Sequence, residues 1–465
     1  MRSVRHYALC ALLVCGTILP IPFLSHRAHA EEAQDWIDSE RLYSHVEQLA
    51  RTARPPATET EFAAAVYVEN TLRSYGYKTK LDPFSYYTYR KPTTLSLTME
   101  EWPGQKWTVS GFAFGINGTA TAEVVDAGLG RAVDFANDAS RGKIALVKRG
   151  EISFGEKVRQ AAAAGAVALI IWNDREEGWN ASLGEPLDIA VPVIALSKAD
   201  GTKLQKRIMD KRRVNGTVKV EGAVSSKQTS YNIVASRKPI QNDTGQVVLV
   251  SAHHDSAGLS VGANHNGSGV AALLEIARNM ADKPIDTEVR FVSFGAVTSG
   301  NRGPIAYANA LSAKERQAMI AAFYVDGVGS QKAELVATNS LGNENLPIQL
   351  LREAGVSTTE KNGTRERNGA ASSLAAAGIP TALVTNAETG HAKEDTLAQM
   401  DWEEITKATK AILSAIHKIT EQTTPAYPLG SPNGGQLKAE SEACSKRLLR
   451  GTFFICGKMR ESNHV

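Results

Sequence analysis

Histidines and acidic residues follow several apolar runs of this chain. His253 and Asp255 come directly after one such run, and His265 follows in a loop rich in Gly, Asn and Ser. Asp326 ends a second run, and His391 comes after a third. If the runs are neighbouring strands, these ring nitrogens and carboxylates would gather at the edge where open α/β sheets bind ligands.

The elements around these residues alternate between strands and helices. Short apolar runs predict buried strands at residues 247–250, 289–294, 322–325 and 379–385. After His265, apolar residues recur at helical spacing from Val270 to Ala277. We therefore expect an α/β fold with a mostly parallel or mixed sheet flanked by helices. Its strands would end at one edge, where open α/β sheets bind ligands.

Composition and the N-terminus limit the class of protein. The chain has 465 residues, of which 43% are hydrophobic and 22% charged, enough for two domains. Its formal net charge is +3 without a basic tract, so no nucleic acid partner is expected. Arg2 and Arg5 precede an apolar stretch, and Ala30 ends an Ala-x-Ala pattern typical of signal peptidase sites. We expect residues 1–30 to be cleaved, leaving a secreted protein without a stable membrane span; a retained anchor is the alternative.

Two cysteines remain after the predicted cleavage site. Cys444 and Cys456 lie close together in a tail that has little apolar material to bury. In an exported protein such a pair is expected to form a disulfide. A Pro/Gly-rich linker at residues 425–435 precedes this tail.

The stretch from Gln246 to Ala277 resembles the di-zinc aminopeptidases, a family of secreted and membrane metallo-exopeptidases. In that family a strand ends in His-x-Asp, as at His253-His254-Asp255, and a loop then leads into a helix, as at residues 262–269. Residues 142–173 resemble a protease-associated (PA) domain, which is a common insert in this family. The resemblance covers nearly all of the chain after the signal peptide, to about residue 420.

This resemblance implies a fold and a domain organisation. We expect a zinc-exopeptidase fold, of the phosphorylase/hydrolase-like kind, over residues 31–109 and 228–424. A β-rich PA domain over residues 110–227 interrupts it, and residues 425–465 form the linker and tail. The role implied for the PA domain is a lid or a wall beside the substrate, and the alternative is a structural spacer.

The resemblance also assigns roles to the metal-site residues. His253 and Asp326 match ligands of the first zinc ion, and His391 matches a ligand of the second. Asp255 matches the carboxylate that orients the ring of His253. Asp395 matches an acidic residue that trails the second ion's histidine.

Several positions depart from the family pattern. The aspartate that bridges the two ions falls on His265, the glutamate that acts as general base on Val297, and a metal-ligating glutamate on Thr298. The family's Ser-Asp-His falls on Gly369-Ala370-Ala371. Paired dications need an anionic bridge, which a neutral imidazole does not provide. No catalytic residue is therefore expected to be intact, and two zinc ions are not expected.

The remaining ligands leave room for one zinc ion. His253, His265 and Asp326 give the ligand count of a catalytic single-zinc site, and His391 would be a fourth ligand. In one alternative, His265 is an exposed turn residue and the site binds no ion firmly. In another, Glu388 or Glu394 completes a two-ion site.

We interpret the chain as a secreted aminopeptidase-family protein with a degraded site and weak or no peptide hydrolysis. Its expected partners are peptides or proteins, as substrates or as ligands held without cleavage. The alternative is an active zinc aminopeptidase that releases N-terminal amino acids. A third interpretation, in which the tail or the PA domain docks the protein at the cell envelope, has no feature in its favour.

Overall fold

The computed structural model describes residues 37–136, 138–176, 178, 181–210, 212–331, 333–339, 344–359, 369–386, 395–421 and 427. The predicted signal peptide, the predicted disulfide between Cys444 and Cys456, and His391, Glu388 and Glu394 lie outside these residues, so the predictions about them remain predictions. No helix among the described residues is long and apolar enough to cross a membrane.

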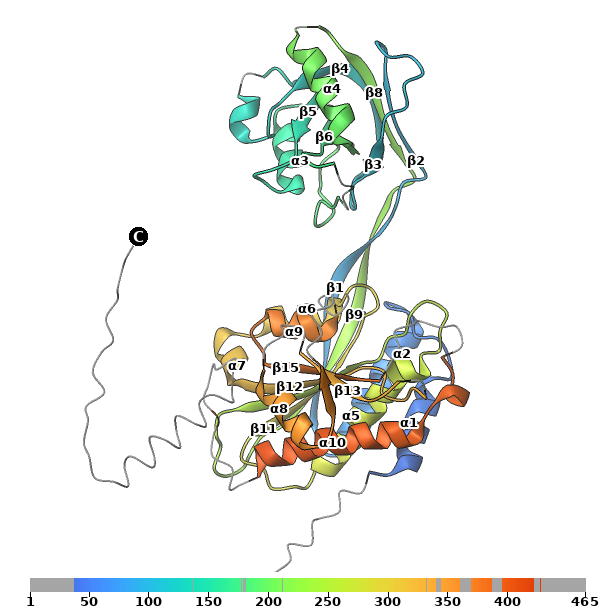
Figure 1. The fold of residues 1–465 in the computed structure, drawn as a ribbon, viewed down its shortest axis with the longest axis vertical. Coiled ribbons are helices and arrows are strands. Elements are labelled where there is room, and N and C mark those ends of the chain that lie inside the picture. The colour runs from blue at the N-terminus through green and yellow to red at the C-terminus, as the bar shows by residue number, and fades with distance from the viewer. Residues whose placement is uncertain are drawn as a thin grey trace, which may run out of the picture.

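An eight-stranded mixed sheet forms the larger body (Figure 1). Its strands, in spatial order, are β1 (Lys78–Arg90), β9 (Val224–Arg237), β11 (Glu288–Phe294), β10 (Val247–His253), β12 (Met319–Val325), β15 (Thr381–Thr385), β13 (Val336–Thr338) and β14 (Ser357–Thr359). The central strands β11, β10, β12 and β15 pair in parallel. All seven residues of β10 are buried, as expected of a parallel strand covered on both faces.

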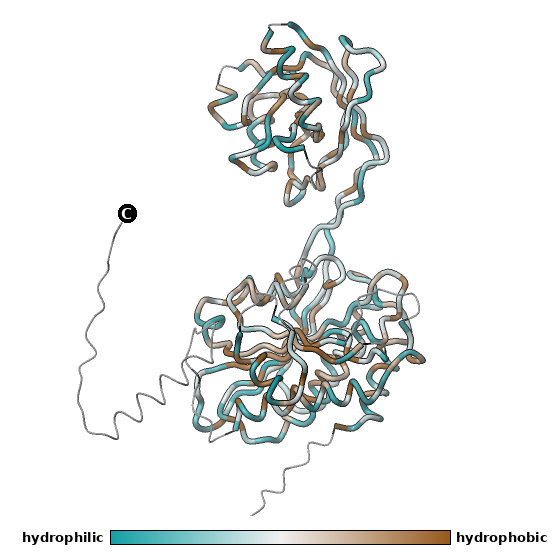
Figure 2. The backbone as a smooth tube through the Cα atoms, viewed as in Figure 1, coloured by the Kyte–Doolittle hydropathy of each residue, from teal (hydrophilic) through white to brown (hydrophobic). Residues whose placement is uncertain are grey.

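Helices cover both faces of this sheet, which confirms the predicted α/β fold. The helices of the larger body are α1 (Ser39–Leu49), α2 (Glu59–Ser74), α5 (Gly269–Met280), α6 (Arg302–Ala310), α7 (Ala313–Ala318), α8 (Leu346–Glu353), α9 (Ala370–Ala376) and α10 (Trp402–Thr420), with short turns η2 (Ala263–Ser268) and η4 (Leu397–Gln399). Helices α1, α2, α5, α8 and α10 contribute to one buried core, and α6 and α9 to a second. In Figure 2 the central strands between these helices are the most hydrophobic part of the body.

The pleat of strand β10 decides which core each site residue faces. Val248, Val250 and Ala252 lie in the core under α1, α5 and α10, whereas Val247 and Leu249 lie in the core under α6 and α9. Because side chains alternate along a strand, His253 follows the α6/α9 face.

A seven-stranded sheet forms the smaller body (Figure 1). Its strands, in spatial order, are β2 (Thr94–Met99), β8 (Asn215–Glu221), β4 (Gly118–Asp126), β5 (Ile144–Lys148), β6 (Ala168–Trp172), β7 (Val193–Leu196) and β3 (Val109–Gly111). Helices α3 (Phe154–Ala163) and α4 (Lys198–Met209) pack against them, and the turn η1 (Ala132–Phe135) packs against α3.

The two bodies are joined by the antiparallel pair β1 and β9. The pairing runs without interruption from Lys78 opposite Ser236 to Arg90 opposite Val224, and Figure 1 shows it as a twisted ribbon between the bodies. Strand β2 lies before residue 110, yet it pairs with β8 in the smaller sheet. We therefore propose that the inserted domain begins near residue 91, earlier than residue 110.

Candidate metal centre

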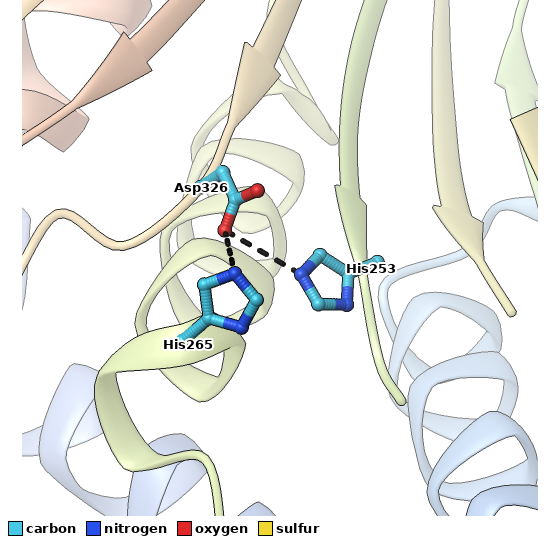
Figure 3. Close-up of side chains that lie close together, drawn as sticks. All are labelled: His253, His265 and Asp326. Atoms are coloured by element: carbon cyan, nitrogen blue, oxygen red, sulfur yellow. Dashed lines mark ion pairs between the residues drawn. The ribbon is translucent and has the colours of Figure 1, made fainter. Parts of the chain in front are cut away.

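Two neighbouring strands and one loop bring His253, His265 and Asp326 together. His253 ends β10, and Asp326 follows the last residue of β12, which pairs with β10 in parallel. His265 lies in η2, between β10 and α5. Figure 3 shows both imidazole rings facing the carboxylate of Asp326. The Nε2 atoms of His253 and His265 lie 3.4 Å and 3.5 Å from its Oδ1.

This arrangement fits a metal ion. One ligand atom from each of the three residues lies within 4.8 Å of the others. Nε2 of His253 and Oδ1 of Asp326 are buried and have no hydrogen-bond partner among the described residues, a costly state that a cation would relieve. The side chain of Asp326 is 21% exposed and that of His265 is 22% exposed, so the group is open on one side. Two imidazoles and a carboxylate suit zinc.

The electrostatics of the group also favour a positive charge. Burial lowers the pKa of His253, but the carboxylates of Asp326 and Asp255 more than reverse this and raise the pKa to about 10. Burial raises the pKa of Asp326, but the imidazoles of His265 and His253 outweigh it and leave that pKa below its ordinary value. A proton or a metal ion between these side chains is therefore stabilised by both carboxylates.

Asp255 orients the ring of His253 from behind. It is fully buried, and its Oδ1 accepts hydrogen bonds from Nδ1 of His253 at 3.2 Å and from the backbone N–H of Val297 at 3.0 Å. Because Nδ1 keeps its proton in this bond, Nε2 is the ring nitrogen whose lone pair a metal ion would take in place of a proton. Burial raises the pKa of Asp255, but its bonds to His253 and Thr298 keep that pKa well below the ordinary range.

Asp395 fixes the loop that carries His265. Its two carboxylate oxygens accept hydrogen bonds from the backbone N–H groups of Asn264, at 2.6 Å, and His265, at 2.9 Å. The imidazole is thus placed by a carboxylate more than a hundred residues later in the chain.

Replacing Asp395 by Ala is expected to lower the free energy of unfolding by about 2 kcal/mol, because two hydrogen bonds to a charged acceptor are lost. Zinc affinity is expected to fall about tenfold, because the loop of His265 loses its tether. Urea unfolding and zinc titration measure the two effects. Asp395→Asn keeps one acceptor oxygen and should show a smaller loss of both. Unchanged zinc affinity in Asp395→Ala would contradict this role.

Arg54 holds the loop after His253, a role that the sequence did not indicate. The guanidinium is almost completely buried and donates to the backbone carbonyls of Leu49, Val261, His254 and Gly262. Three of these carbonyls lie at the two ends of the loop between β10 and η2, and that of Leu49 ends helix α1. A single arginine ahead of two prolines carries no pattern that would reveal these contacts.

Glu61 holds the turn after strand β11. Its carboxylate accepts hydrogen bonds from the backbone N–H of Ala296 and the hydroxyl of Ser230, each at 2.8 Å, and from the backbone N–H of Ala57. Ala296 has a left-handed backbone with φ of 48°, which is uncommon for a residue with a side chain. The bond to Glu61 helps to keep this turn in place.

Glu61 gives a pH dependence that can be measured. Burial, with Asp255 nearby, raises its pKa from 4.5 to about 7, although its hydrogen bonds oppose the shift. Between these two values the native state binds more protons than the unfolded state, so stability falls as pH rises, by about 3 kcal/mol in all. Glu61→Gln cannot ionise and should lack this fall. Urea unfolding of metal-free protein at pH 5 and pH 8 compares the two, and parallel curves would contradict the prediction.

Five buried residues of the core under α6 and α9, the face that His253 follows, form a set that we call the apolar wall: Phe294, Val297, Tyr324, Ala370 and Ala371. Val297 is the most exposed of them at 9%. Tyr324 lies in β12 and Asp326 directly follows that strand, two residues later, so the alternation of side chains points both to the same side of the sheet. Thr298 does not join the ligand group, because its hydroxyl donates to Asp255.

Comparisons with known proteins identify the family. Residues 232–416 match the model of peptidase family M28, and residues 120–204 match that of the PA domain. Aminopeptidase YwaD of Bacillus subtilis is 33% identical over 358 residues, which cover 74% of this chain and 75% of the relative. The chain belongs to peptidase family M28. An aminopeptidase of Pseudomonas aeruginosa is 34% identical over 298 residues, covering 60% of this chain and 54% of the relative.

Solved structures agree with this membership in M28. The aminopeptidase from Aneurinibacillus sp. strain AM-1 aligns with a TM-score of 0.61 and 32% identity, covering 85% of this chain and 98% of that one. BSAP, a zinc aminopeptidase from Bacillus subtilis, aligns with a TM-score of 0.54 and 27% identity, over 85% and 99% of the two chains. The predicted metallo-exopeptidase family with an inserted PA domain is thereby confirmed.

Proposed function

We propose that this M28 protein binds one zinc ion and holds peptides, and that it cleaves peptide bonds weakly or not at all. The observation that carries the proposal is a group of only three ligands on the same face of the sheet as the apolar wall. The resemblance implies carboxylates where Val297 and Ala370 stand, and in this fold both positions lie in a packed apolar core. The alternative is an active zinc aminopeptidase, which the names of the relatives favour.

Charge limits the number of ions. Two zinc ions about 4 Å apart repel by about 17 kcal/mol at an effective dielectric constant of 20, so they need anionic ligands between them. Within the described residues, the metal-binding group contains one carboxylate, that of Asp326. The carboxylate of Asp255 is already bonded to His253, Val297 and Thr298. His265 as a neutral imidazole adds a lone pair but no charge.

The described site also lacks a group to take a proton from water. The side chain of Val297 has no acceptor, and the hydroxyl of Thr298 is engaged with Asp255. Glu61 is nearby, but its carboxylate is bonded to Ala57, Ala296 and Ser230. Loss of general-base assistance costs about 10² to 10⁴ in rate.

The remaining residues have roles in binding. Zinc, when bound, supplies a Lewis acid that polarises a carbonyl oxygen. His253, His265 and Asp326 would hold it, with His391 as a proposed fourth ligand, and Asp255 fixes the ring of His253. We also propose that the protein is secreted after cleavage near Ala30, and that the PA domain forms a wall or lid beside the bound peptide.

Hydrolysis of a chromogenic aminoacyl amide tests the proposal. With zinc added, kcat/KM is expected to be at least about 10² below that of the Bacillus subtilis zinc aminopeptidase assayed in parallel. Val297→Glu and His265→Glu are each expected to leave it low, because several groups are needed together. A rate equal to that of the relative, abolished by a chelator and by His253→Ala, would establish the active enzyme instead.

A further inference from the structure

We propose that Thr298 is a positioning residue, which holds Asp255 so that His253 presents Nε2 to the metal. The inference rests on the proposed function, because it concerns how this chain would hold its single ion. It assigns a new task to the position where the family resemblance implies a metal-ligating glutamate.

The contacts form a chain of three side chains. The hydroxyl of Thr298 donates to Oδ2 of Asp255 at 2.7 Å, and its backbone N–H donates to the same oxygen at 2.8 Å. The other oxygen, Oδ1, accepts from Nδ1 of His253 at 3.2 Å. Nε2 of that ring faces Asp326 at 3.4 Å. The hydroxyl of Thr298, which is outside the ligand group, is therefore linked through Asp255 to the ring of His253 and so to Nε2, the nitrogen that would bind the metal.

Burial makes this linkage matter. Asp255 and His253 are both completely buried, so water does not replace a missing donor. The terminal torsion of an aspartate has a broad minimum, and its orientation is fixed by the donors around it. The bond from His253 is the longest of the four that Asp255 accepts within the described chain. Losing the shortest of them would let the carboxylate turn away from the ring.

Threonine and glutamate have opposite consequences at this position. An ionised glutamate only accepts hydrogen bonds, so it would repel Asp255 and would need a cation. Threonine donates instead, and its branched Cβ restricts the torsion that aims the hydroxyl. Threonine at this position therefore supplies no metal ligand, but its hydroxyl helps to hold the imidazole of His253 through Asp255.

Zinc affinity of three proteins tests the proposal by competition with a chromophoric chelator. Thr298→Val keeps the shape but removes the hydroxyl, and it is expected to bind zinc about tenfold more weakly than the wild type. Thr298→Ser restores the hydroxyl and should recover most of the affinity. Thr71→Val, which removes a threonine hydroxyl bonded to the carbonyl of Tyr67 in α2, is the matched control and should bind like the wild type.

A second readout does not need metal. In the metal-free wild type, NMR of the histidine rings should show the proton of His253 on Nδ1, and Thr298→Val should show a weakened or exchanging signal. Equal zinc affinity of Thr298→Val and the wild type would overturn the inference and leave the proposed function standing. If the wild type binds no zinc, the proposed function fails, and an unchanged His253 signal in Thr298→Val then overturns the inference as well.

Discussion

Asp326→Asn is expected to lower zinc affinity by about a thousandfold or more, which corresponds to about 4 kcal/mol. Asp326 is the one carboxylate in the metal-binding group of the described residues, and its Oδ1 lies within 3.5 Å of both imidazoles. The amide keeps the shape of the side chain but removes the negative charge that a dication needs. Isothermal titration with zinc measures the effect.

Asp243→Asn is the matched control, because it makes the same change of charge at an exposed aspartate. That variant should bind zinc like the wild type. If Asp326→Asn also binds like the wild type, the ion is held elsewhere, and the three-ligand group is not the metal site.

Arg54→Ala is expected to cause the largest loss of stability, on the order of 4 kcal/mol or more. The side chain is 1% exposed and donates to four backbone carbonyls, and each buried acceptor left unpaired costs about 1–3 kcal/mol. Burial lowers the pKa of Arg54 to about 10, and the carboxylates of Asp255 and Asp395 oppose that shift. Alanine also leaves the buried charge of Asp255 without this nearby cation.

Urea unfolding of metal-free protein measures this loss. Arg54→Lys should lose less stability than Arg54→Ala, because the ammonium group still offers three of the five donors that a guanidinium has. Arg51→Ala removes an exposed arginine three residues earlier and should change stability by less than about 0.5 kcal/mol. A loss in Arg54→Ala no larger than in Arg51→Ala would show that the buried contacts add little.

The sequence predicts the sheet and the ends of its strands because both depend on local patterns. Val247 to Val250 is an apolar run long enough for one strand, and His253 must then emerge where that strand ends. Asp326 follows a similar run. Parallel pairing brings those two ends together, so the pair is predictable once the fold class is known.

Other parts of the site depend on contacts between distant residues, which no local pattern records. Arg54 bonds to carbonyls about 200 residues later, and Glu61 bonds to Ala296. Thr298 differs from the implied glutamate, but only the structure shows that its hydroxyl donates to Asp255. The start of the inserted domain also cannot be predicted from a local sequence pattern, because the pairing of β2 with β8 joins strands more than a hundred residues apart.

The number of zinc ions bound per chain at saturation tests the central claim most directly. Metal analysis of protein loaded with excess zinc and then freed of unbound metal gives this number. The charge and the ligands of the described site predict one ion per chain, lost in Asp326→Asn. Two ions per chain would contradict the account, because the site would then contain anionic ligands that these residues do not provide.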